Sequence, residues 1–327
     1  MNEQLQKNVV EAAEQIQWLI DETQKVIIGQ DRLIRNLLIA LFAQGHIIVE
    51  WVPGLAKTLA IETLGKTLWV DVGRIQFTPD LLPSDLIGTQ IWNSSDSSFS
   101  TQKGPVFSHL ILADEINRAP AKVQSALLEA MSERQVTIGQ TSYPLEVPFV
   151  VMATQNPVEN DGTYDLPEAQ LDRFLLKTNL DYPTPEQELL IMKRFAGDEP
   201  VPSVKEVMHR EHILAYQSLV DQIHISESIY EYVRNIVVAT RFPEQAWLPE
   251  LESYIQFGAS PRASLALIKA AKVIAMMHAR TFVIPEDVQE IAEDVLKHRV
   301  VLHFDSEIDG MSIDTIIQKI LASVPVV

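Results

Sequence analysis

The chain has 327 residues, which at roughly 150 residues per domain corresponds to about two domains and is long enough to bury a substantial core. It carries 26 basic and 44 acidic side chains, and the resulting net charge of −18 disfavours non-specific binding to a nucleic-acid backbone. With 46% hydrophobic and 21% charged residues, the composition is that of a globular protein and excludes a disordered or collagen-like chain.

The chain contains no cysteine, which excludes disulfides, thiolate metal sites and cysteine nucleophiles. This composition suits a reducing compartment, so we expect a cytoplasmic location. Neither a signal peptide nor a membrane span is predicted. The N-terminus lacks a basic segment followed by an apolar core, and the longest apolar stretch nearby, residues 37–43, is too short to cross a bilayer.

The first part of the chain combines helical and strand patterns. Apolar residues recur at helical spacing over residues 5–42, with Ile28-Gly29-Gln30 as a break between two helices. Beyond them, short apolar runs separated by helices or loops predict a parallel sheet. These runs are residues 46–49, 74–77, 110–113, 149–153 and 174–180. Two alternating segments, residues 88–106 and 135–147, predict β-hairpin insertions.

The pattern changes after Tyr182-Pro183-Thr184-Pro185. We expect no strands beyond this point, only helices separated by proline-containing joints at residues 200–202, 243–249 and 285. The sequence therefore predicts two domains, residues 1–182 and a separate helical domain over residues 183–327.

A candidate phosphate-binding segment follows the first strand. Residues 47–49 lead into Glu50-Trp51-Val52-Pro53-Gly54-Leu55-Ala56-Lys57-Thr58, and a helical pattern covers residues 59–68. In this order of strand, loop and helix, backbone amides and a helix N-terminus can surround a polyphosphate. Lys57 would neutralise the β and γ phosphates, and the Thr58 hydroxyl would ligate Mg²⁺.

The strict pattern G-x-x-x-x-G-K-[ST] is not met in this segment. Trp51 stands at the first glycine and Ala56 at the second. Since Pro-Gly turns before a lysine-containing helix are common, a simple tight turn is the alternative interpretation.

Two carboxylates follow the apolar run at 110–113. Successive strand residues point to opposite sides, so we expect Asp114 to face the metal held by Thr58 and Glu115 to face an attacking water. Glu115 would then orient and polarise the nucleophile of phosphoryl transfer. The alternative is a solvated strand end.

Two more polar side chains are placed near the same sheet edge. Asn156 follows the strand at 149–154, where its amide can reach the γ-phosphate and the water. Arg173 lies at the edge of the next strand, where a guanidinium would stabilise charge in the transition state. Its alternative role is a salt bridge to Asp172 or Glu168.

A predicted helix start near residue 260 places a cation next to the positive end of the helix dipole, which is unfavourable. Ser260 is predicted as the N-cap and Pro261 as the first helical residue, which puts Arg262 in the first turn. A phosphate bound at this helix start would justify the charge, and the alternative is a surface arginine with an acid nearby.

Five of these segments form a set. They are Pro53-Gly54-Leu55-Ala56-Lys57-Thr58, residues 112–120, Ala153-Thr154-Gln155-Asn156-Pro157, residues 166–174 and Gly258-Ala259-Ser260-Pro261-Arg262-Ala263. Together they strongly resemble the MoxR family of AAA+ ATPases, and the match covers nearly the whole chain. The resemblance implies an α/β fold: a P-loop NTPase αβα core with a five-stranded parallel sheet and two β-hairpin insertions, followed by an all-helical lid domain.

The resemblance also implies a Mg²⁺-dependent ATPase that assembles as a homo-oligomeric ring, usually hexameric, with ATP between subunits. Its implied catalytic residues are Lys57 (Walker A), Glu115 (Walker B), Asn156 (sensor 1) and Arg173 (arginine finger). Thr58 and Asp114 are the implied Mg²⁺ ligands. The implied ATP contacts are Ile28 and Gly29 on the adenine, Pro53, Gly54, Leu55, Ala56, Lys57, Thr58 and Leu59 in the loop and helix start, and Arg262 as sensor 2.

Members of this family look like chaperones that remodel or activate partner proteins, often partners with von Willebrand factor A domains. In such proteins the two hairpins tend to face the pore of the ring and the substrate.

Trp51 is the main departure from the family pattern, because relatives carry glycine there while Ala56 is normal for them. A positive φ at this position would cost a residue with a side chain about 1 to 2 kcal/mol, whereas a negative φ would cost little. An alternative function is therefore a nucleotide-gated scaffold whose hydrolysis is weakened by Trp51. A nucleic-acid motor is a second alternative, and the charge of −18 disfavours it.

Overall fold

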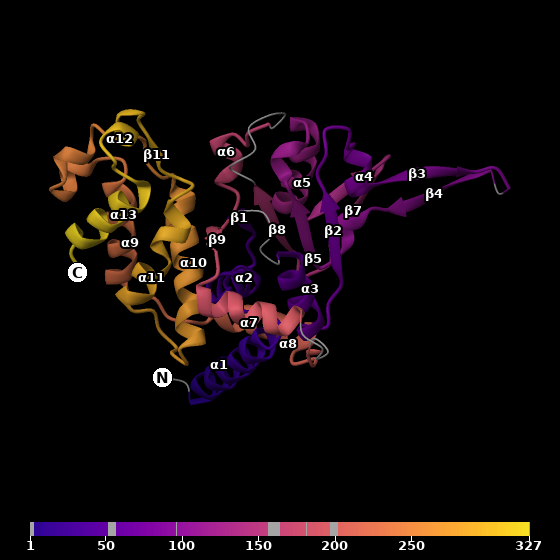
Figure 1. The fold of residues 1–327 in the computed structure, drawn as a ribbon, viewed down its shortest axis with the longest axis horizontal. Helices are drawn as coiled ribbons and strands as arrows, with labels where there is room; N and C mark the ends of the chain where they lie inside the picture. Colours follow the sequence, from indigo (N-terminus) through magenta and orange to yellow (C-terminus); the bar gives the residue numbers. More distant parts are fainter. Residues whose placement is uncertain are drawn as a thin grey trace. The chain divides into compact units, whose positions relative to one another are not determined.

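The computed structural model describes residues 3–51, 57–95, 97–155, 164–180, 182–196 and 202–326, without the side chains of Trp51 and Glu307. The chain forms two compact units (Figure 1). The first, here called the sheet unit, comprises Gln17–Arg173 and Thr178–Ala215. The second, the helical unit, comprises Met1–Ile16, Phe174–Lys177 and Tyr216–Val327. The two units are interleaved along the chain, and the division between residues 182 and 183 stays a prediction.

A five-stranded parallel sheet is the centre of the sheet unit, as the apolar runs predicted. Its strand order is β2-β5-β8-β1-β9, so every strand has a neighbour that is not adjacent in sequence. The strands are β1 Ile47–Trp51, β2 Val72–Gln76, β5 Leu110–Asp114, β8 Val150–Gln155 and β9 Leu176–Leu180. The central strands β5 and β8 are buried almost throughout, which is why they are continuous apolar runs rather than alternating patterns.

The parallel register brings the carboxyl ends of the strands together. Gln76 at the end of β2 is paired with Asp114 at the end of β5, and Val49 on β1 is paired with Thr154 on β8. Polar residues that end these strands therefore meet at one edge of the sheet.

Helices on the sheet unit pack through their apolar stripes. Helix α2 (Asp31–Phe42) contacts β1 and β8, and α3 (Lys57–Thr67) contacts β2 and β5. The remaining elements are α1 Glu3–Gln24, α4 Pro83–Ile87, η1 Pro105–Phe107, η2 Ile116–Arg118, α5 Ala121–Glu133, α6 Glu168–Leu171, α7 Pro185–Phe195 and α8 Arg210–Asp221. Helix α1 contributes to both units, and so does α8.

Both predicted hairpins are confirmed. Strand β3 (Gly88–Asn93) pairs with β4 (Ser98–Lys103), and β6 (Gln135–Ile138) pairs with β7 (Thr141–Pro144). The β3–β4 hairpin extends well beyond the sheet (Figure 1). A hydrogen bond of 2.9 Å between the Thr101 and Tyr143 hydroxyls joins the two hairpins near their base.

The helical unit is built mainly from four helices with a shared apolar core. Helix α10 packs against α9 and α11, and α13 also contacts both of these helices. The elements are α9 Glu227–Ala239, η3 Pro243–Ala246, η4 Pro249–Leu251, α10 Pro261–Met277, α11 Pro285–Leu296, α12 Asp305–Ile308 and α13 Ile313–Ser323. In the described ranges of the chain, no helix has both the length and the apolar character needed to traverse a bilayer.

The expectation that strands stop after residue 182 was wrong in one detail. Strand β10 (Ile255–Phe257) pairs with β11 (Val301–Leu302) in a small antiparallel sheet. Runs of three and two residues are too short to show an alternating pattern, and their pairing joins segments far apart in sequence.

Candidate active site

A buried carboxylate at the end of β5 is the centre of the site. The Asp114 side chain has several partners although the residue is only 2% exposed. Its Oδ1 accepts hydrogen bonds from Lys57 Nζ and from Thr154 Oγ1, the latter at 2.9 Å. Its Oδ2 accepts one from Arg74 Nη2 at 3.0 Å. Since a buried unpaired carboxylate is costly, two cations and a hydroxyl account for its stability here.

Lys57 reaches this carboxylate from the first residue of α3, and it is itself 7% exposed. Thr58 follows it in the first turn, half-buried, where the helix N-terminus favours negatively charged ligands. The fold thus brings together the Lys-Thr pair and the acidic strand end, as the sequence predicted. Pro53, Gly54, Leu55 and Ala56 lie outside the described residues, and so does the Trp51 side chain.

Glu115 is not part of the strand. Strand β5 ends at Asp114, and Glu115 adopts the left-handed conformation with φ of 58°. The argument from strand alternation was therefore wrong: the chain turns after Asp114, and this turn separates the two carboxylates. Glu115 Oε2 accepts a hydrogen bond from Gln76 Nε2 at 3.1 Å and forms an ion pair with Arg118 Nε at 3.2 Å.

Thr154 connects the two acidic residues and was missed by the sequence analysis. Its Oγ1 donates to Asp114 Oδ1 at 2.9 Å and accepts from the Glu115 backbone N–H at 2.9 Å. The signal that could have found it is a polar residue at the end of an otherwise apolar run. A left-handed residue other than glycine costs about 1 to 2 kcal/mol, and the Thr154 bond helps to hold Glu115 in that conformation.

Arg74, Gln76 and Arg118 were also missed. Arg74 lies in the middle of β2, Gln76 at its end and Arg118 in η2 after β5, and each contacts one of the two carboxylates. The available signal was a polar side chain in or directly after an apolar run, but the sequence does not say which carboxylate each one contacts.

The donor set fits a magnesium ion. Thr58 offers a hydroxyl and Asp114 a carboxylate, which are the oxygen donors that Mg²⁺ prefers. Lys57 and Arg74 now pair with Asp114, so a bound Mg²⁺ would take the place of the Lys57 ammonium, which the phosphates would attract away.

Arg173 contacts the end of another helix. Its Nη1 donates to the Leu128 carbonyl at 3.0 Å and to Ser132 Oγ at 2.6 Å, both in the C-terminal part of α5. Ser132 Oγ also donates to the Leu128 carbonyl, at 2.9 Å. A cation near a helix C-terminus is favourable because the negative end of the helix dipole attracts it. These contacts take the place of the salt bridge to Asp172 or Glu168 that was the alternative expectation.

The other expected contacts are spread over the chain. Asn156 lies outside the described residues, whereas Ile28, Gly29 and Leu59 are half-buried in the sheet unit. Arg262 is exposed in the helical unit, where Ser260 Oγ accepts its backbone N–H at 3.1 Å. This bond confirms Ser260 as the N-cap of α10.

The chain matches known proteins over most of its length. Residues 46–176 match the model of the ATPase family associated with various cellular activities (AAA), and residues 251–320 match the AAA lid domain. It is 48% identical to "Chaperone MoxR1" of Mycobacterium tuberculosis, over 93% of this chain and 80% of that protein. The chain belongs to the MoxR family of AAA+ ATPases.

Other MoxR relatives agree with this assignment. The chain is 32% identical to "Protein MoxR" of Methylorubrum extorquens over 86% of each protein, and 41% identical to "Uncharacterized protein YeaC" of Bacillus subtilis over 94% of this chain and 93% of that one. A crystal structure of a candidate ATPase from Cytophaga hutchinsonii matches with a TM-score of 0.93 and 49% identity, over 98% of this chain and 97% of that one. The alternative of a scaffold with weakened hydrolysis finds no support in these relatives.

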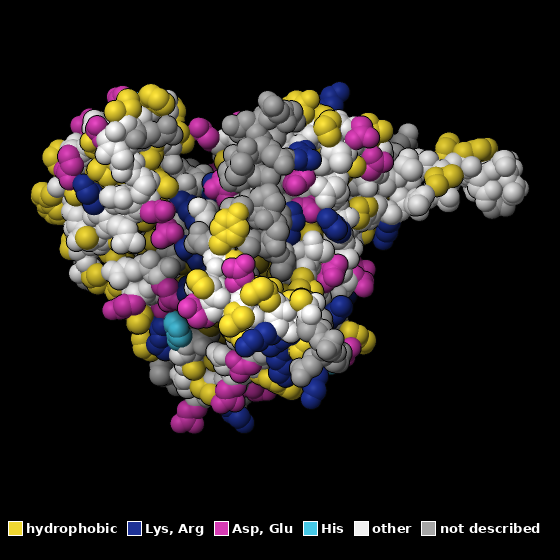
Figure 2. Space-filling view, viewed as in Figure 1, with side chains coloured by type: hydrophobic (Ala, Val, Ile, Leu, Met, Phe, Trp, Pro, Cys, Tyr) yellow, Lys and Arg dark blue, Asp and Glu magenta, His cyan; other side chains and the backbone are white. Residues whose placement is uncertain are grey.

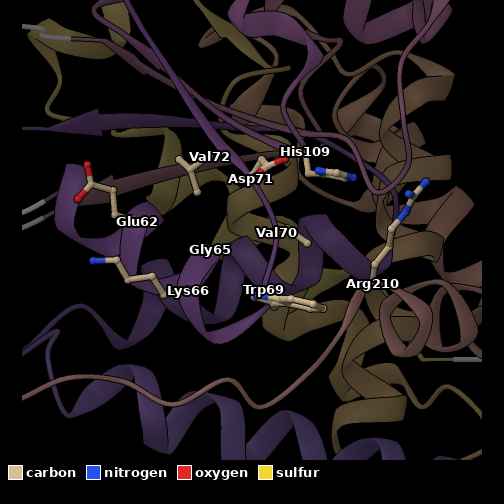
Figure 3. A pocket seen from close by; sticks show the side chains of 9 residues that line it. All are labelled: Glu62, Gly65, Lys66, Trp69, Val70, Asp71, Val72, His109 and Arg210. Atoms are coloured by element: carbon tan, nitrogen blue, oxygen red, sulfur yellow. The ribbon is translucent and has the colours of Figure 1, made fainter.

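A pocket of about 580 Å³ lies at the opposite end of helix α3 (Figure 3). Gly65 and Lys66 in the last turn of α3 line it, together with Trp69, His109 and Arg210. Both ring nitrogens of His109 are buried without a hydrogen-bond partner in the described part of the chain. Because Lys57 and Thr58 are at the other end of α3, this pocket is separate from the predicted nucleotide site.

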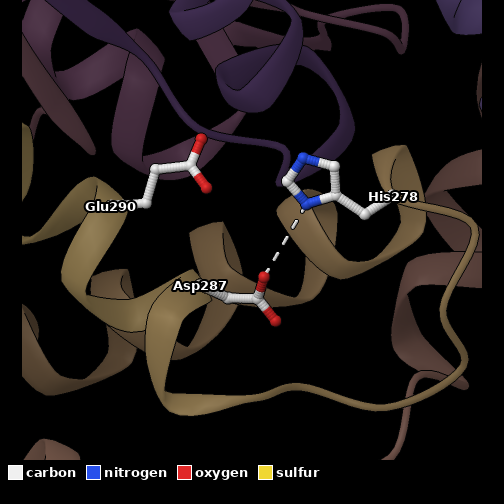
Figure 4. A group of neighbouring side chains, drawn as sticks. All are labelled: His278, Asp287 and Glu290. Atoms are coloured by element: carbon white, nitrogen blue, oxygen red, sulfur yellow. Dashed lines mark ion pairs between the residues drawn. The ribbon is translucent and has the colours of Figure 1, made fainter.

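A second cluster contains three potential metal ligands in the helical unit, His278, Asp287 and Glu290 (Figure 4). The Asp287 carboxylate accepts hydrogen bonds from both terminal nitrogens of Arg280 and from the Ile284 backbone N–H at 2.9 Å. The guanidinium therefore already supplies the positive charge at this carboxylate, and the cluster stabilises the start of α11 rather than a metal.

Proposed function

We propose that this MoxR-family protein is a Mg²⁺-dependent ATPase that works as a homo-oligomeric, hexameric ring and remodels or activates partner proteins. The observation that carries the proposal is the buried Asp114 carboxylate held by Lys57 at the start of α3. An acidic strand end next to a lysine at a helix N-terminus is the arrangement that phosphoryl transfer needs, because the lysine and a metal can share the charge of the phosphates.

In this proposal, Thr58 and Asp114 hold Mg²⁺, which when bound neutralises charge on the phosphates. Lys57 exchanges its contact with Asp114 for the β and γ phosphates. The loop residues Pro53, Gly54, Leu55 and Ala56 and the helix residue Leu59 surround the phosphates, and Ile28 and Gly29 contact the adenine. That ATP is the nucleotide rests on the family resemblance.

Glu115 is the proposed base that orients the attacking water. Its contacts to Gln76, Arg118 and Thr154 support this role, because they hold the carboxylate and its backbone in one arrangement. Asn156 is proposed to contact the water and the γ-phosphate, and Arg262 to contact the phosphates from the helical unit.

Arg173 is proposed to act on the nucleotide of a neighbouring subunit. Its contacts to Leu128 and Ser132 are hydrogen bonds to one carbonyl and one hydroxyl, and the side chain is exposed. Such contacts are weak enough to be exchanged for a phosphate, since a guanidinium binds phosphate through charge-assisted hydrogen bonds. A ring is then required for full activity.

The β3–β4 hairpin is the proposed contact surface for the partner protein. Its exposed hydrophobic side chains are Ile91, Trp92 and Phe99, and Trp92 packs edge-on against Phe99. Figure 2 shows hydrophobic side chains gathered towards the far end of this hairpin. Exposed aromatic residues are typical of protein contact sites. The family resemblance points to a partner with a von Willebrand factor A domain, and the absence of cysteine supports a cytoplasmic location.

The test is phosphate release measured across Mg²⁺ and protein concentration. We expect ATP hydrolysis that requires Mg²⁺, is abolished in Lys57→Ala and Glu115→Gln, and rises per subunit as the protein assembles. Lys66→Ala is the matched control, because Lys66 is exposed at the other end of α3 and should leave the rate unchanged.

Mixing Arg173→Ala with Glu115→Gln tests the shared site. If Arg173 acts across an interface, mixed rings contain sites with an intact Glu115 and an intact Arg173 from the neighbour, and activity returns. Hydrolysis that is independent of protein concentration and of mixing would contradict the ring.

A further inference from the structure

Gly29, one of the two expected adenine contacts, lies directly against helix α7. Its φ of 74° is in the left-handed region, and a side chain at residue 29 would place its Cβ 2.6 Å from Gln187 Oε1 and 3.2 Å from Gln187 Nε2. The left-handed φ is what favours glycine at this position. The carboxamide of Gln187 therefore occupies the space beside the Gly29 backbone that a side chain would otherwise fill.

Helix α7 is held along this segment at two points. The Arg194 guanidinium donates a hydrogen bond to the Lys25 carbonyl, and Gln187 contacts Gly29 two turns earlier in the helix. Gln187 and Arg194 are about 10 Å apart along the helix, so α7 runs alongside residues 25–29, which precede α2. All of these residues belong to the sheet unit.

The orientation of the Gln187 carboxamide is set by the start of α7. Thr184 Oγ1 accepts the Gln187 backbone N–H at 3.3 Å, and Gln187 Oε1 accepts the Thr184 backbone N–H at 2.9 Å. This capping box engages the carboxamide oxygen. The amide nitrogen carries two N–H donors, and no hydrogen-bond partner for them is found in the described part of the chain.

We propose that Gln187 is a base-recognition residue of the nucleotide site, with Nε2 donating a hydrogen bond to a ring nitrogen of adenine. The inference rests on the proposed function, in which Ile28 and Gly29 contact the base. A base lying against the Gly29 backbone meets a half-buried amide donor whose oxygen is already engaged. The complementary group on the base is an acceptor, and adenine offers N1, N3 and N7.

The variant Gln187→Glu separates recognition from helix capping. Glutamate also serves as the third residue of a capping box, so its carboxylate can accept the Thr184 N–H while the amide donors are lost. Gln187→Met is a second variant, which removes both the cap and the donors. Thermal unfolding of each variant shows whether α7 keeps its place.

The experiment measures binding of Mg-ATP and of its 1-deaza, 3-deaza and 7-deaza analogues, each of which lacks one acceptor. In the parent protein we expect one analogue to bind about 2- to 12-fold more weakly than ATP, the range of a single hydrogen bond. In Gln187→Glu this ratio should fall to about one. The four nucleotides carry the same charge, so the ratio cancels any repulsion from the new carboxylate. Since Gln187 contacts the base and not the phosphates, KM should rise while kcat at saturating ATP is kept.

Two results overturn the inference. One is a parent protein that binds ATP and all three analogues equally well, and the other is a Gln187→Glu protein with the same discrimination as the parent. A parent protein that binds no ATP overturns the proposed function itself, and the role of Gln187 with it, and is thereby distinguished from the first two results.

Discussion

Thr154 is expected to determine both the stability of the site and the rate of hydrolysis. The change Thr154→Val keeps the shape of a fully buried side chain but removes Oγ1, which bonds Asp114 and the Glu115 N–H. Loss of the bond to the charged carboxylate costs about 1.5 to 3 kcal/mol, and the unpaired N–H adds about 1 kcal/mol or more. Asp114 keeps its contacts to Lys57 and Arg74, so these two costs set the size of the effect, and we expect the free energy of unfolding to fall by about 2.5 to 4 kcal/mol.

The same change should slow hydrolysis without weakening binding. Glu115 loses the contact that holds its left-handed backbone, so the carboxylate is less well oriented toward the water. An orientation loss of about 1.4 to 2.7 kcal/mol corresponds to a roughly 10- to 100-fold lower kcat. KM should stay within about twofold, because Lys57 and the start of α3 are untouched.

Urea denaturation and steady-state phosphate release measure the two effects. Thr154→Ser is the matched control, since it keeps the hydroxyl and loses only a methyl group, at about 1 kcal/mol of stability. Parental kcat in Thr154→Val, or equal damage in Thr154→Ser and Thr154→Val, would refute the reasoning.

Three other predictions concern stability and the hairpin. Burial lowers the pKa of His46 to about 4, so below pH 6.5 the unfolded chain takes up a proton that the folded histidine does not. The contribution of His46 to the free energy of unfolding should therefore fall by up to about 3 kcal/mol as the pH drops from 6.5 to 4. His46→Asn should remove this share of the slope in urea titrations at several pH values, and an unchanged slope would contradict the assignment. Arg299 is 8% exposed and donates hydrogen bonds to the carbonyls of Phe174, Leu175 and Val295. Arg299→Met should therefore lower the free energy of unfolding, measured by urea denaturation, by about 3 kcal/mol or more. A loss below about 1 kcal/mol would contradict the role of these bonds. The Trp92 and Phe99 side chains are 53% and 64% exposed, so replacing each by serine should change the free energy of unfolding by no more than about 0.5 kcal/mol and keep basal hydrolysis. Stimulation of hydrolysis by a partner protein should be lost. Unchanged stimulation would place the partner contact elsewhere.

Much of the sheet unit could be predicted because its signals are local. A fully buried parallel strand is a short apolar run, a hairpin is two alternating segments around a turn, and both patterns are complete within about twenty residues. A position of Asp114 near the Lys57-Thr58 pair was also expected, because phosphate chemistry requires a lysine at a helix start and an acid at a strand end. The direct ion pair between Lys57 and Asp114 was not predicted. The start of α10 at Ser260 and Pro261 followed from capping chemistry alone.

The tertiary structure decided where side chains distant in sequence meet. The strand order placed Thr154 beside Asp114 and Glu115, and the packing of α7 brought Gln187 to Gly29. The turn after β5 took Glu115 out of the strand, so its direction could not be read from strand alternation. Such contacts depend on chain closure over many residues and on how whole elements pack, and no local periodicity records them. The sequence by itself determined the elements and the chemistry available at their ends, and the folded chain determined which of those groups face one another.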